Sequence, residues 1–298
     1  MHVFITGAAG FIGKAVTKEL ISHGHTVTGL ARNDANASII TSLGATPLRG
    51  DLKDLDSLKA GAAAADGVIH LAFIHDFSDF EGVCATDRAA ISAIGEVLAG
   101  TGKPFVLASG TMMCDPGTIA TEDSRKKPDP PFDARAKSAD LVYSLAAEKG
   151  IRASVLRFAP TVYADGDGGF VGYLINMFKQ KGGPVVYVND GQARWPACHR
   201  DDAAVLVRLG LEKGRAGATY HAVSEQGVKV REIVEMIGRN LGVPVESKSM
   251  EEALPTFAFF AHLMDSDNPA SSEKTRKELG WETSGPTLIA DFETNFPK

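Results

Sequence analysis

The stretch TGAAGFIG at residues 6–13 decides the fold of this chain, since it follows a short apolar run at residues 2–5 and precedes an amphipathic helical segment. In a strand–turn–helix unit, Gly7 permits the tight turn, Gly10 leaves room for a pyrophosphate, and Gly13 lets the helix pack closely on the sheet. The helix N-terminus then offers free N–H groups and a partial positive charge. This context predicts a dinucleotide-binding loop; a structural turn without a ligand is the alternative.

Outward from this loop, short apolar runs alternate with amphipathic segments of helical length. Strands are predicted at residues 26–31, 66–72, 104–108 and 153–158. Their nearly unbroken apolar character is typical of strands buried on both faces, as in a parallel sheet covered by helices. Right-handed crossovers between such strands predict an α/β fold of the Rossmann type, with a doubly wound parallel sheet.

Composition narrows the class of partner. The 298 residues carry a formal net charge of -6, which disfavours nucleic acid and anionic membrane surfaces as partners. Cys84, Cys114 and Cys198 are too few for a disulfide framework, and no CxxC pair or His/Asp/Glu cluster suggests a metal. No signal peptide or membrane span is visible, so a cytoplasmic location is expected.

The end of the second predicted strand bears on the cofactor. A site for NAD usually has an acid here to hold the ribose 2′-hydroxyl, whereas an arginine suits the 2′-phosphate of NADP. The run GLARN at residues 29–33 offers Arg32 and no acid. We therefore predict NADP(H), with a solvated surface role for Arg32 as the alternative.

Two further segments follow predicted strands, at the carboxyl edge of the sheet where ligands bind. They are GDL at residues 50–52 and HLA at residues 70–72. Asp51 is placed to accept a hydrogen bond from the adenine amino group. The alternative, which can hold at the same time, is that Asp51 caps the helix predicted near residues 55–59.

These motifs, together with four later ones, resemble the extended short-chain dehydrogenase/reductases, a group of epimerases, dehydratases and reductases. The later motifs are a serine after the fifth strand, RFAPTVY at residues 157–163, ACHRDDAA at residues 197–204 and ELGW at residues 278–281. The resemblance implies an NADP-binding Rossmann domain over residues 1–165 and a substrate lobe over residues 166–298, with parts near residues 199–223 returning to the core. It also implies a homodimer through helices near residues 80–100 and 134–149.

The family's catalytic pair is a Tyr and a Lys four residues later, on one face of a helix, with a Ser or Thr nearby. The Lys lowers the pKa of the Tyr and holds the nicotinamide ribose, and the Tyr exchanges the proton. In the run DARAKSAD, residues 133–140, Lys137 fits the family's Lys, and Asp133 stands where the Tyr belongs. Asp133 suits a base; as an acid it would need a pKa raised by burial, against the effect of Lys137.

Other side chains are candidates for the missing chemistry. Thr111 is expected to hydrogen-bond the substrate, or else to cap a turn. His75, Tyr163 and His199 are candidate proton donors, each with a purely structural role as the alternative. An apolar wall of Met112, Met113, Phe170 and Trp195 would line the pocket, or else belong to the ordinary core.

The sequence thus predicts an NADPH-dependent oxidoreductase acting on a carbonyl or imine of a small metabolite, without the family's Tyr. Two alternatives stay open: a non-redox isomerase or lyase that keeps NADP as a scaffold, and a regulator that senses the dinucleotide. The candidate catalytic residues are Lys137, Thr111, Asp133, Tyr163 and His75. The residues expected to bind the cofactor are Thr6, Gly7, Gly10, Phe11, Ile12, Gly13, Arg32, Asp51, Leu52, Leu71, Ala72 and Lys137.

Overall fold

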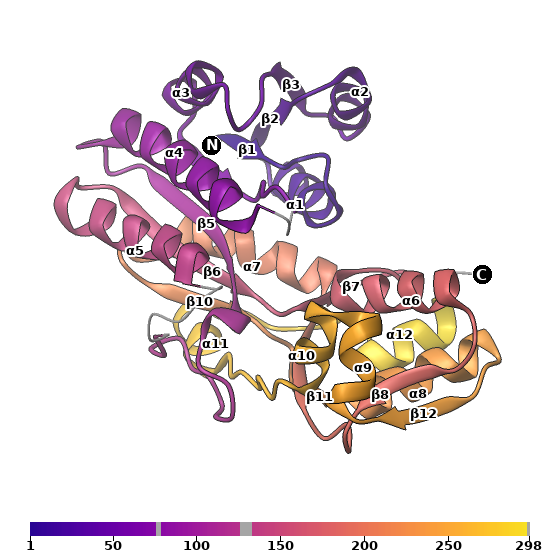
Figure 1. Ribbon diagram of the computed structural model, residues 1–298. Helices are drawn as coiled ribbons and strands as arrows, with labels where there is room; N and C mark the ends of the chain where they lie inside the picture. Colours follow the sequence, from indigo (N-terminus) through magenta and orange to yellow (C-terminus); the bar gives the residue numbers. More distant parts are fainter. Residues whose placement is uncertain (76–78, 126–132, 297–298) are drawn as a thin grey trace.

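The larger part of the chain forms a parallel sheet between two layers of helices (Figure 1). The structure, a computed structural model, describes residues 1–75, 79–125 and 133–296. Within them, seven strands pair in the order β10-β6-β5-β4-β1-β2-β3, all parallel, which confirms the α/β doubly wound fold. The strands are β1 (His2–Thr6), β2 (Thr26–Ala31), β3 (Thr46–Arg49), β4 (Gly67–His70), β5 (Pro104–Gly110), β6 (Arg152–Phe158) and β10 (Thr219–Ala222).

Alternating side chains of each strand enter different cores, as the period of two in a strand requires. Val3 and Ile5 of β1 join one buried cluster with side chains of α1 and α7, and Phe4 joins another with side chains of α3, α4 and α5. The apolar runs are therefore buried on both faces. The helices are α1 (Phe11–Ser22), α2 (Asp34–Ser42), α3 (Leu55–Ala64), α4 (Phe80–Leu98), α5 (Asp133–Glu148) and α7 (Arg200–Lys213).

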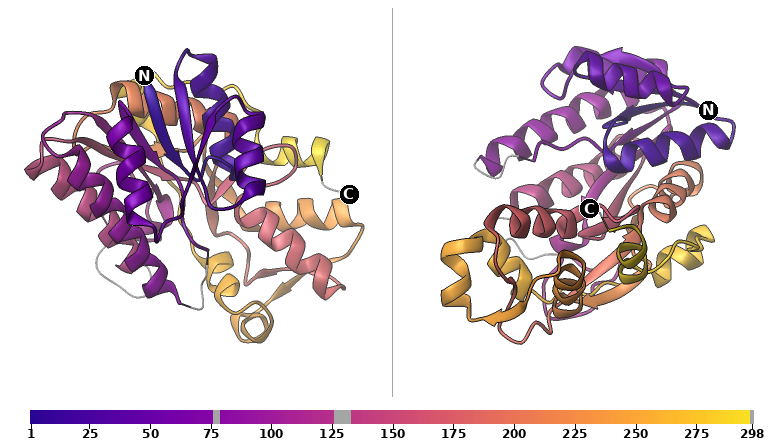
Figure 2. Two further views of the ribbon diagram at one scale, coloured as in Figure 1. Left: turned by 90° about the horizontal axis from the view of Figure 1, so that it is seen from above. Right: turned by 90° about the vertical axis from the view of Figure 1, so that its right-hand side faces the viewer.

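A second, smaller lobe has its own core of aromatic and branched side chains, which includes the buried Trp195. Its strands form a three-stranded sheet, β11-β9-β7, and a parallel pair, β12-β8. In both views of Figure 2 its orange helices α9 and α10 lie at the opposite end of the molecule from the N-terminus. Its elements are β7 (Thr161–Tyr163), α6 (Gly169–Lys181), β8 (Val185–Val188), β9 (Arg194–His199), β11 (Glu225–Lys229), α8 (Val230–Leu241), β12 (Val245–Lys248), α9 (Met250–Phe257), α10 (Phe259–Asp265) and α12 (Leu288–Asn295).

The chain passes between the two parts several times. After β9, helix α7 packs against α1, and β10 then pairs with β6 at the edge of the large sheet. Helix α11 (Glu273–Leu279) returns to α7 and β10, and the buried Trp281 after it donates a hydrogen bond to the carbonyl of Asp202, 2.9 Å away. These crossings hold the lobe beside the carboxyl ends of the strands. No helix of the described residues is long and apolar enough to cross a membrane.

Candidate active site

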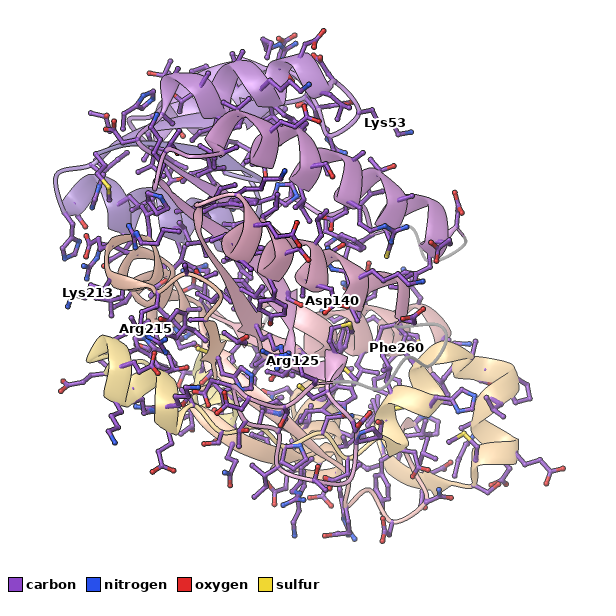
Figure 3. All side chains as sticks on the ribbon, turned by 90° about the vertical axis from the view of Figure 1, so that its left-hand side faces the viewer. Lys53, Arg125, Asp140, Lys213, Arg215 and Phe260 are labelled. Atoms are coloured by element: carbon purple, nitrogen blue, oxygen red, sulfur yellow. The ribbon has the colours of Figure 1, made fainter. Side chains whose placement is uncertain are left out.

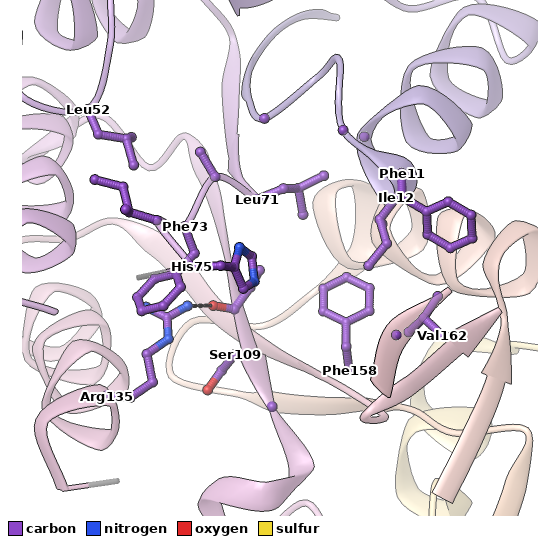
Figure 4. Close-up of a pocket in the computed structure, with 18 of the residues that line it drawn as sticks. Phe11, Ile12, Leu52, Leu71, Phe73, His75, Ser109, Arg135, Phe158 and Val162 are labelled. Carbon is purple, nitrogen blue, oxygen red and sulfur yellow. Dashed lines mark hydrogen bonds between the residues drawn. The ribbon is translucent and has the colours of Figure 1, made fainter. Parts of the chain in front are cut away.

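A cavity of about 1050 Å³ runs along the carboxyl ends of β1, β2, β4 and β5 and ends against α6 of the second lobe (Figure 4). One end is formed by the glycine loop, the end of β2 and the turn after β3. The other end is formed by the segment after β4, the end of β5, one arginine of α5 and the start of α6. The cavity therefore joins the predicted dinucleotide site to the junction of the two lobes.

The glycine loop is shaped for a phosphate. A Cβ on Gly13 would lie 2.0 Å from the carbonyl oxygen of Gly7, and one on Gly7 would lie 2.9 Å from the backbone nitrogen of Ala72, so the packing of the backbone requires both glycines. A Cβ on Gly10 would contact only Gly7, at 3.2 Å, and would otherwise enter the cavity. Helix α1 begins after Gly10 with no side-chain cap and no acid in its first turn. Its free N–H groups thus fit a pyrophosphate.

At the far end of this site, Arg32 and Asn36 line the cavity beside Asp51 and Lys53. Arg32 is exposed and forms no ion pair within the described part of the chain, whereas the neighbouring Arg49 is paired with Asp34 at 3.1 Å. The arrangement leaves Arg32 available to a ligand.

Asp51 does not cap the following helix. The cap of α3 is Asp54, whose carboxylate accepts from the backbone nitrogen of Ser57. The carboxylate of Asp51 accepts from the backbone nitrogen of Lys53 at 2.7 Å, which is a local turn, and its side chain lines the cavity. The capping alternative for Asp51 is therefore wrong, because α3 begins three residues later than such a cap would allow.

Thr6 lies behind the loop and does not line the cavity. Its hydroxyl oxygen accepts from the backbone nitrogen of Ala72 at 3.2 Å and lies 2.8 Å from Nδ1 of His70. Nε2 of His70 lies 3.2 Å from the buried carboxylate of Asp87, which also accepts from Arg135. Thr6 therefore supports the site from beneath, through a buried chain of hydrogen bonds that reaches α5.

Helix α5 presents a face to the cavity that the sequence did not predict. Asp133 and Lys137 form an ion pair of 2.9 Å, and neither lines the cavity; the Lys137 side chain is 54% exposed. Arg135 lines the cavity, and Ala139, one turn later, is buried. Two residues correspond to about 200° around a helix. The pair Asp133 and Lys137 therefore lies on nearly the opposite face from Arg135 and Ala139. The surface position of Asp140 in Figure 3 fits this orientation. The placement of the family's Tyr and Lys positions at Asp133 and Lys137 was therefore wrong, because these two residues lie on the face of α5 that points away from the cavity.

Arg135, which the sequence pattern did not single out, is held in place by three neighbours. Its guanidinium donates to the carboxylate of Asp87 and, at 2.7 Å, to the carbonyl of Ala108 at the end of β5. The ring of Phe73 lies over it, with 4.2 Å between the guanidinium carbon and the ring centroid (Figure 4). The side chain is 11% exposed. These contacts fix its position with part of the guanidinium at the cavity wall.

The structure separates the remaining catalytic candidates. Ser109 and Tyr173 are the hydroxyl residues among the described lining of the cavity, whereas Thr111 is buried, does not line it, and its Oγ1 has no hydrogen-bond partner in the described residues. Tyr163 is buried outside the cavity, where its hydroxyl oxygen lies 3.0 Å from the carboxylate of Glu225 and 2.7 Å from the carbonyl oxygen of Pro286, the two acceptors for its one O–H. Burial raises the pKa of Tyr163 further above its usual range. Tyr163 therefore has a structural role.

Of the two histidine candidates, one lines the cavity and the other does not. His75 lines the cavity, and loss of solvation, followed by the charge of Arg135, lowers the pKa of its imidazole. His199 sits at the N-terminus of α7, where its ring accepts from the backbone nitrogen of Asp201 at 3.4 Å, and it does not line the cavity. Of these two, only His75 can reach a bound molecule.

The wall of the substrate end is apolar and aromatic. Trp195 lies behind it, buried, with its ring 6.0 Å from that of Phe170. No group of His, Cys, Asp and Glu in the described residues could hold a metal ion. The apolar lining residues at this end are Phe73, Ile74, Phe80, Met112, Met113, Phe158, Ala159, Pro160, Val162, Phe170 and Tyr173.

Comparison with known proteins agrees with this geometry. Residues 3–224 match the NAD dependent epimerase/dehydratase family. The chain belongs to this family. The resemblance found in the sequence is thereby confirmed.

The relatives fall into two ranges of sequence identity. The chain is 45% identical to the uncharacterized proteins C2A9.02 of Schizosaccharomyces pombe, over 296 residues, and YLL056C of Saccharomyces cerevisiae, over 298 residues; each alignment covers 99% of both chains. It is 24% identical to a 4-hydroxy-2-methyl-3-oxo-4-farnesyl-3,4-dihydroquinoline-1-oxide ketoreductase of Stigmatella aurantiaca, over 94% of this chain and 92% of the relative. Among solved structures, dTDP-glucose 4,6-dehydratase of Bacillus anthracis, in complex with NAD, superposes with a TM-score of 0.78 at 17% identity, over 99% and 95% of the two chains.

Proposed function

We propose that this protein is an NADP(H)-dependent oxidoreductase that reduces a carbonyl or imine group of a small, largely apolar metabolite. The observation that carries the proposal is the continuity of the cavity, which joins a phosphate-binding glycine loop to an aromatic wall with few polar groups. The ketoreductase relative supports a carbonyl as the reacting group.

The choice of NADP over NAD rests on the end of β2. Arg32 lines the cavity there, and the neighbouring acid, Asp34, is paired with Arg49 on the surface. A guanidinium binds a phosphate with charge-assisted hydrogen bonds, whereas the ribose hydroxyl of NAD would find no carboxylate at this position. When bound, the dinucleotide supplies the hydride.

The residues of the chain have two tasks around a bound substrate. We assign to the Ser109 hydroxyl a hydrogen bond to the carbonyl oxygen, and the apolar wall packs against the apolar part of the substrate. His75 also lines the cavity, but its lowered pKa keeps the imidazole neutral near pH 7, and its ring is hydrogen-bonded to the backbone of Phe73. The proton that accompanies the hydride is therefore taken from water.

The proposal is tested by mixing the protein with NADPH and a panel of ketones, aldehydes and imines, and following the loss of NADPH absorbance. We expect turnover with at least one apolar carbonyl compound, and a large loss of kcat in the Ser109→Ala variant. Thermal denaturation with NADPH, NADP, NADH and NAD gives an independent readout of binding, because a ligand at 100 times its Kd adds about 2.7 kcal/mol of stability.

The outcomes also separate the two other functions. Stabilisation by NADPH without turnover of any reducible compound would favour the dinucleotide sensor or the non-redox enzyme. The observation that favours these is the cavity face of α5, where Arg135 and Ala139 stand in place of a Tyr and a Lys. No stabilisation by any dinucleotide would contradict the proposed function itself.

A further inference from the structure

We propose that Arg135 binds a carboxylate that the substrate carries next to its carbonyl group, so that the substrates are apolar oxo acids. This inference rests on the proposed function and names its substrate class. It depends on three properties of Arg135: its position, the charges around it and the geometry of its anchors.

The position gives Arg135 direct access to a ligand. A guanidinium has five N–H donors, and the described structure assigns one of them to Asp87 and one to Ala108. Arg135 and Ser109 both line the cavity, and the guanidinium donates to the carbonyl of Ala108, the residue directly before Ser109. A molecule whose carbonyl oxygen meets Ser109 therefore has Arg135 within reach of a neighbouring substituent.

The charges around Arg135 favour an anion. No carboxylate of the described residues lines the substrate end of the cavity, and the one other basic side chain at this end, His75, has a lowered pKa. Asp87 balances the charge of Arg135 from behind, at 1% exposure, and is also hydrogen-bonded by His70. Burial opposes ionisation of Asp87, but His70 and Arg135 outweigh it and lower the pKa of this carboxyl. A bound carboxylate would thus meet the cation of Arg135, with no acid among the described lining residues at this end.

The anchors orient the guanidinium in advance. Asp87 and Ala108 hold it from two sides, and Phe73 covers one of its faces. A planar guanidinium fixed in this way matches the two oxygens of a carboxylate better than a flexible ammonium does. The apolar surroundings strengthen the attraction, since fewer waters screen it.

Arg88 on α4 provides a matched comparison within the same protein. It too donates to a backbone carbonyl, that of Ala134 at 2.9 Å, and to a carboxylate, that of Glu81 at 3.0 Å. Arg88 does not line the cavity. A purely structural role for Arg135 would make the two arginines behave alike toward small molecules.

The test is calorimetric titration of the protein, with and without NADP, using benzoylformate, whose carboxylate is attached to the keto carbon, and its methyl ester. The two probes share the aromatic ketone and differ in charge, and the oxidised dinucleotide cannot reduce them. We expect the carboxylate to bind at least about tenfold more tightly than the ester, as one charged hydrogen-bonded pair implies. Arg135→Met should abolish the preference, Arg135→Lys should keep part of it, and Arg88→Met should leave it unchanged.

The double variant Asp87→Asn/Arg135→Met covers the case in which Arg135→Met alone fails to fold, because it removes both buried charges together. It should also show no preference for the carboxylate. Equal binding of the two probes to the native protein, no binding of the carboxylate, or a preference that survives in the double variant would overturn the inference. Stabilisation by NADPH, measured separately, shows whether the proposed function has failed as well.

Discussion

The two ends of the cavity are built in different ways. The dinucleotide end is made of backbone: Gly7 and Gly13 are required by close approach, and the N-terminus of α1 supplies the donors. The substrate end is made of long side chains that neighbouring elements hold in place, as Asp87 on α4 holds Arg135 on α5. A backbone site is fixed by local sequence, whereas a side-chain site is fixed by which helix face meets the sheet.

The largest expected effect comes from the ion pair that builds the substrate end. Asp87 is 1% exposed, and Asp87→Ala leaves the cation of Arg135 without its buried partner. This loss should lower the free energy of unfolding by about 3–5 kcal/mol. Asp133→Ala breaks the pair with the exposed Lys137 on the outer face of α5 and should cost far less, because water screens such a pair. Urea unfolding measures both. Similar losses in the two variants would contradict the assignment of α5 faces.

The next prediction concerns the backbone end. Gly10→Val places a side chain in the cavity, with only Gly7 near its Cβ, and should weaken NADPH binding at least 100-fold, or about 2.7 kcal/mol. The fold should survive, because Gly10 has an ordinary φ of -76°. Thermal shift with NADPH measures the loss.

Gly210→Ala is the matched control for this variant. Gly210 lies on α7, outside the cavity, where a Cβ would meet Leu156 at 3.8 Å, an ordinary contact. Alanine there should leave NADPH binding unchanged and raise stability by about 0.5–1 kcal/mol. Undiminished NADPH affinity in Gly10→Val would show that the pyrophosphate does not sit at this loop.

A smaller effect is expected from the end of β2. Arg32→Ala should weaken NADPH binding about tenfold, the value of one charged hydrogen bond, and leave NADH binding unchanged. Arg49→Ala, which removes a nearby exposed arginine paired with Asp34, should change neither. Fluorescence titration with the two cofactors gives the ratio of the affinities. A ratio unaffected by Arg32→Ala would assign Arg32 to the solvated surface.

The same contrast explains what the sequence could predict. The glycine loop and the parallel sheet were predicted, since a tight turn needs glycine and a strand buried on both faces needs an unbroken apolar run. The orientation of α5 was not, because it depends on packing against α4 and the sheet. A cue was present in the buried stripe of Ala134, Ala139, Val142 and Leu145, since at 100° per residue Arg135 lies within its arc and Lys137 outside it. Matching one lysine to a family pattern overrode that periodicity.

Tyr163 and Thr111 failed as predictions for a related reason. Tyr163 ends β7 and Thr111 follows β5, where a ligand-binding residue is expected, but the direction of a side chain at a strand end depends on its neighbours. Tyr163 turns toward Glu225 and Pro286 of the second lobe, which lie far from it in the sequence. Ser109, two residues before Thr111, lines the cavity instead.

The smallest expected effect links the two charged groups of the substrate end. Loss of solvation and then the charge of Arg135 lower the pKa of His75, so Arg135→Met should raise that pKa toward its ordinary value. Proton NMR of the imidazole across pH 4–8 measures the shift, and Arg88→Met serves as the control. An unchanged His75 pKa in Arg135→Met would mean that the two groups do not share the cavity.

The lowered pKa of His75 also determines how the stability of the protein changes with pH. Between the pKa of folded His75 and the ordinary value of about 6.5, the unfolded chain binds more protons than the folded one. The contribution of His75 to stability is therefore complete above pH 6.5 and is lost as the pH falls through this window. Arg135→Met should bring the pKa of folded His75 closer to the ordinary value and so narrow this pH range. The fall in stability between pH 7 and pH 5 should therefore be shallower in this variant than in Arg88→Met. A steeper fall in stability between pH 7 and pH 5 in Arg135→Met would contradict the prediction, because it would mean that the guanidinium raises the pKa of His75 rather than lowering it.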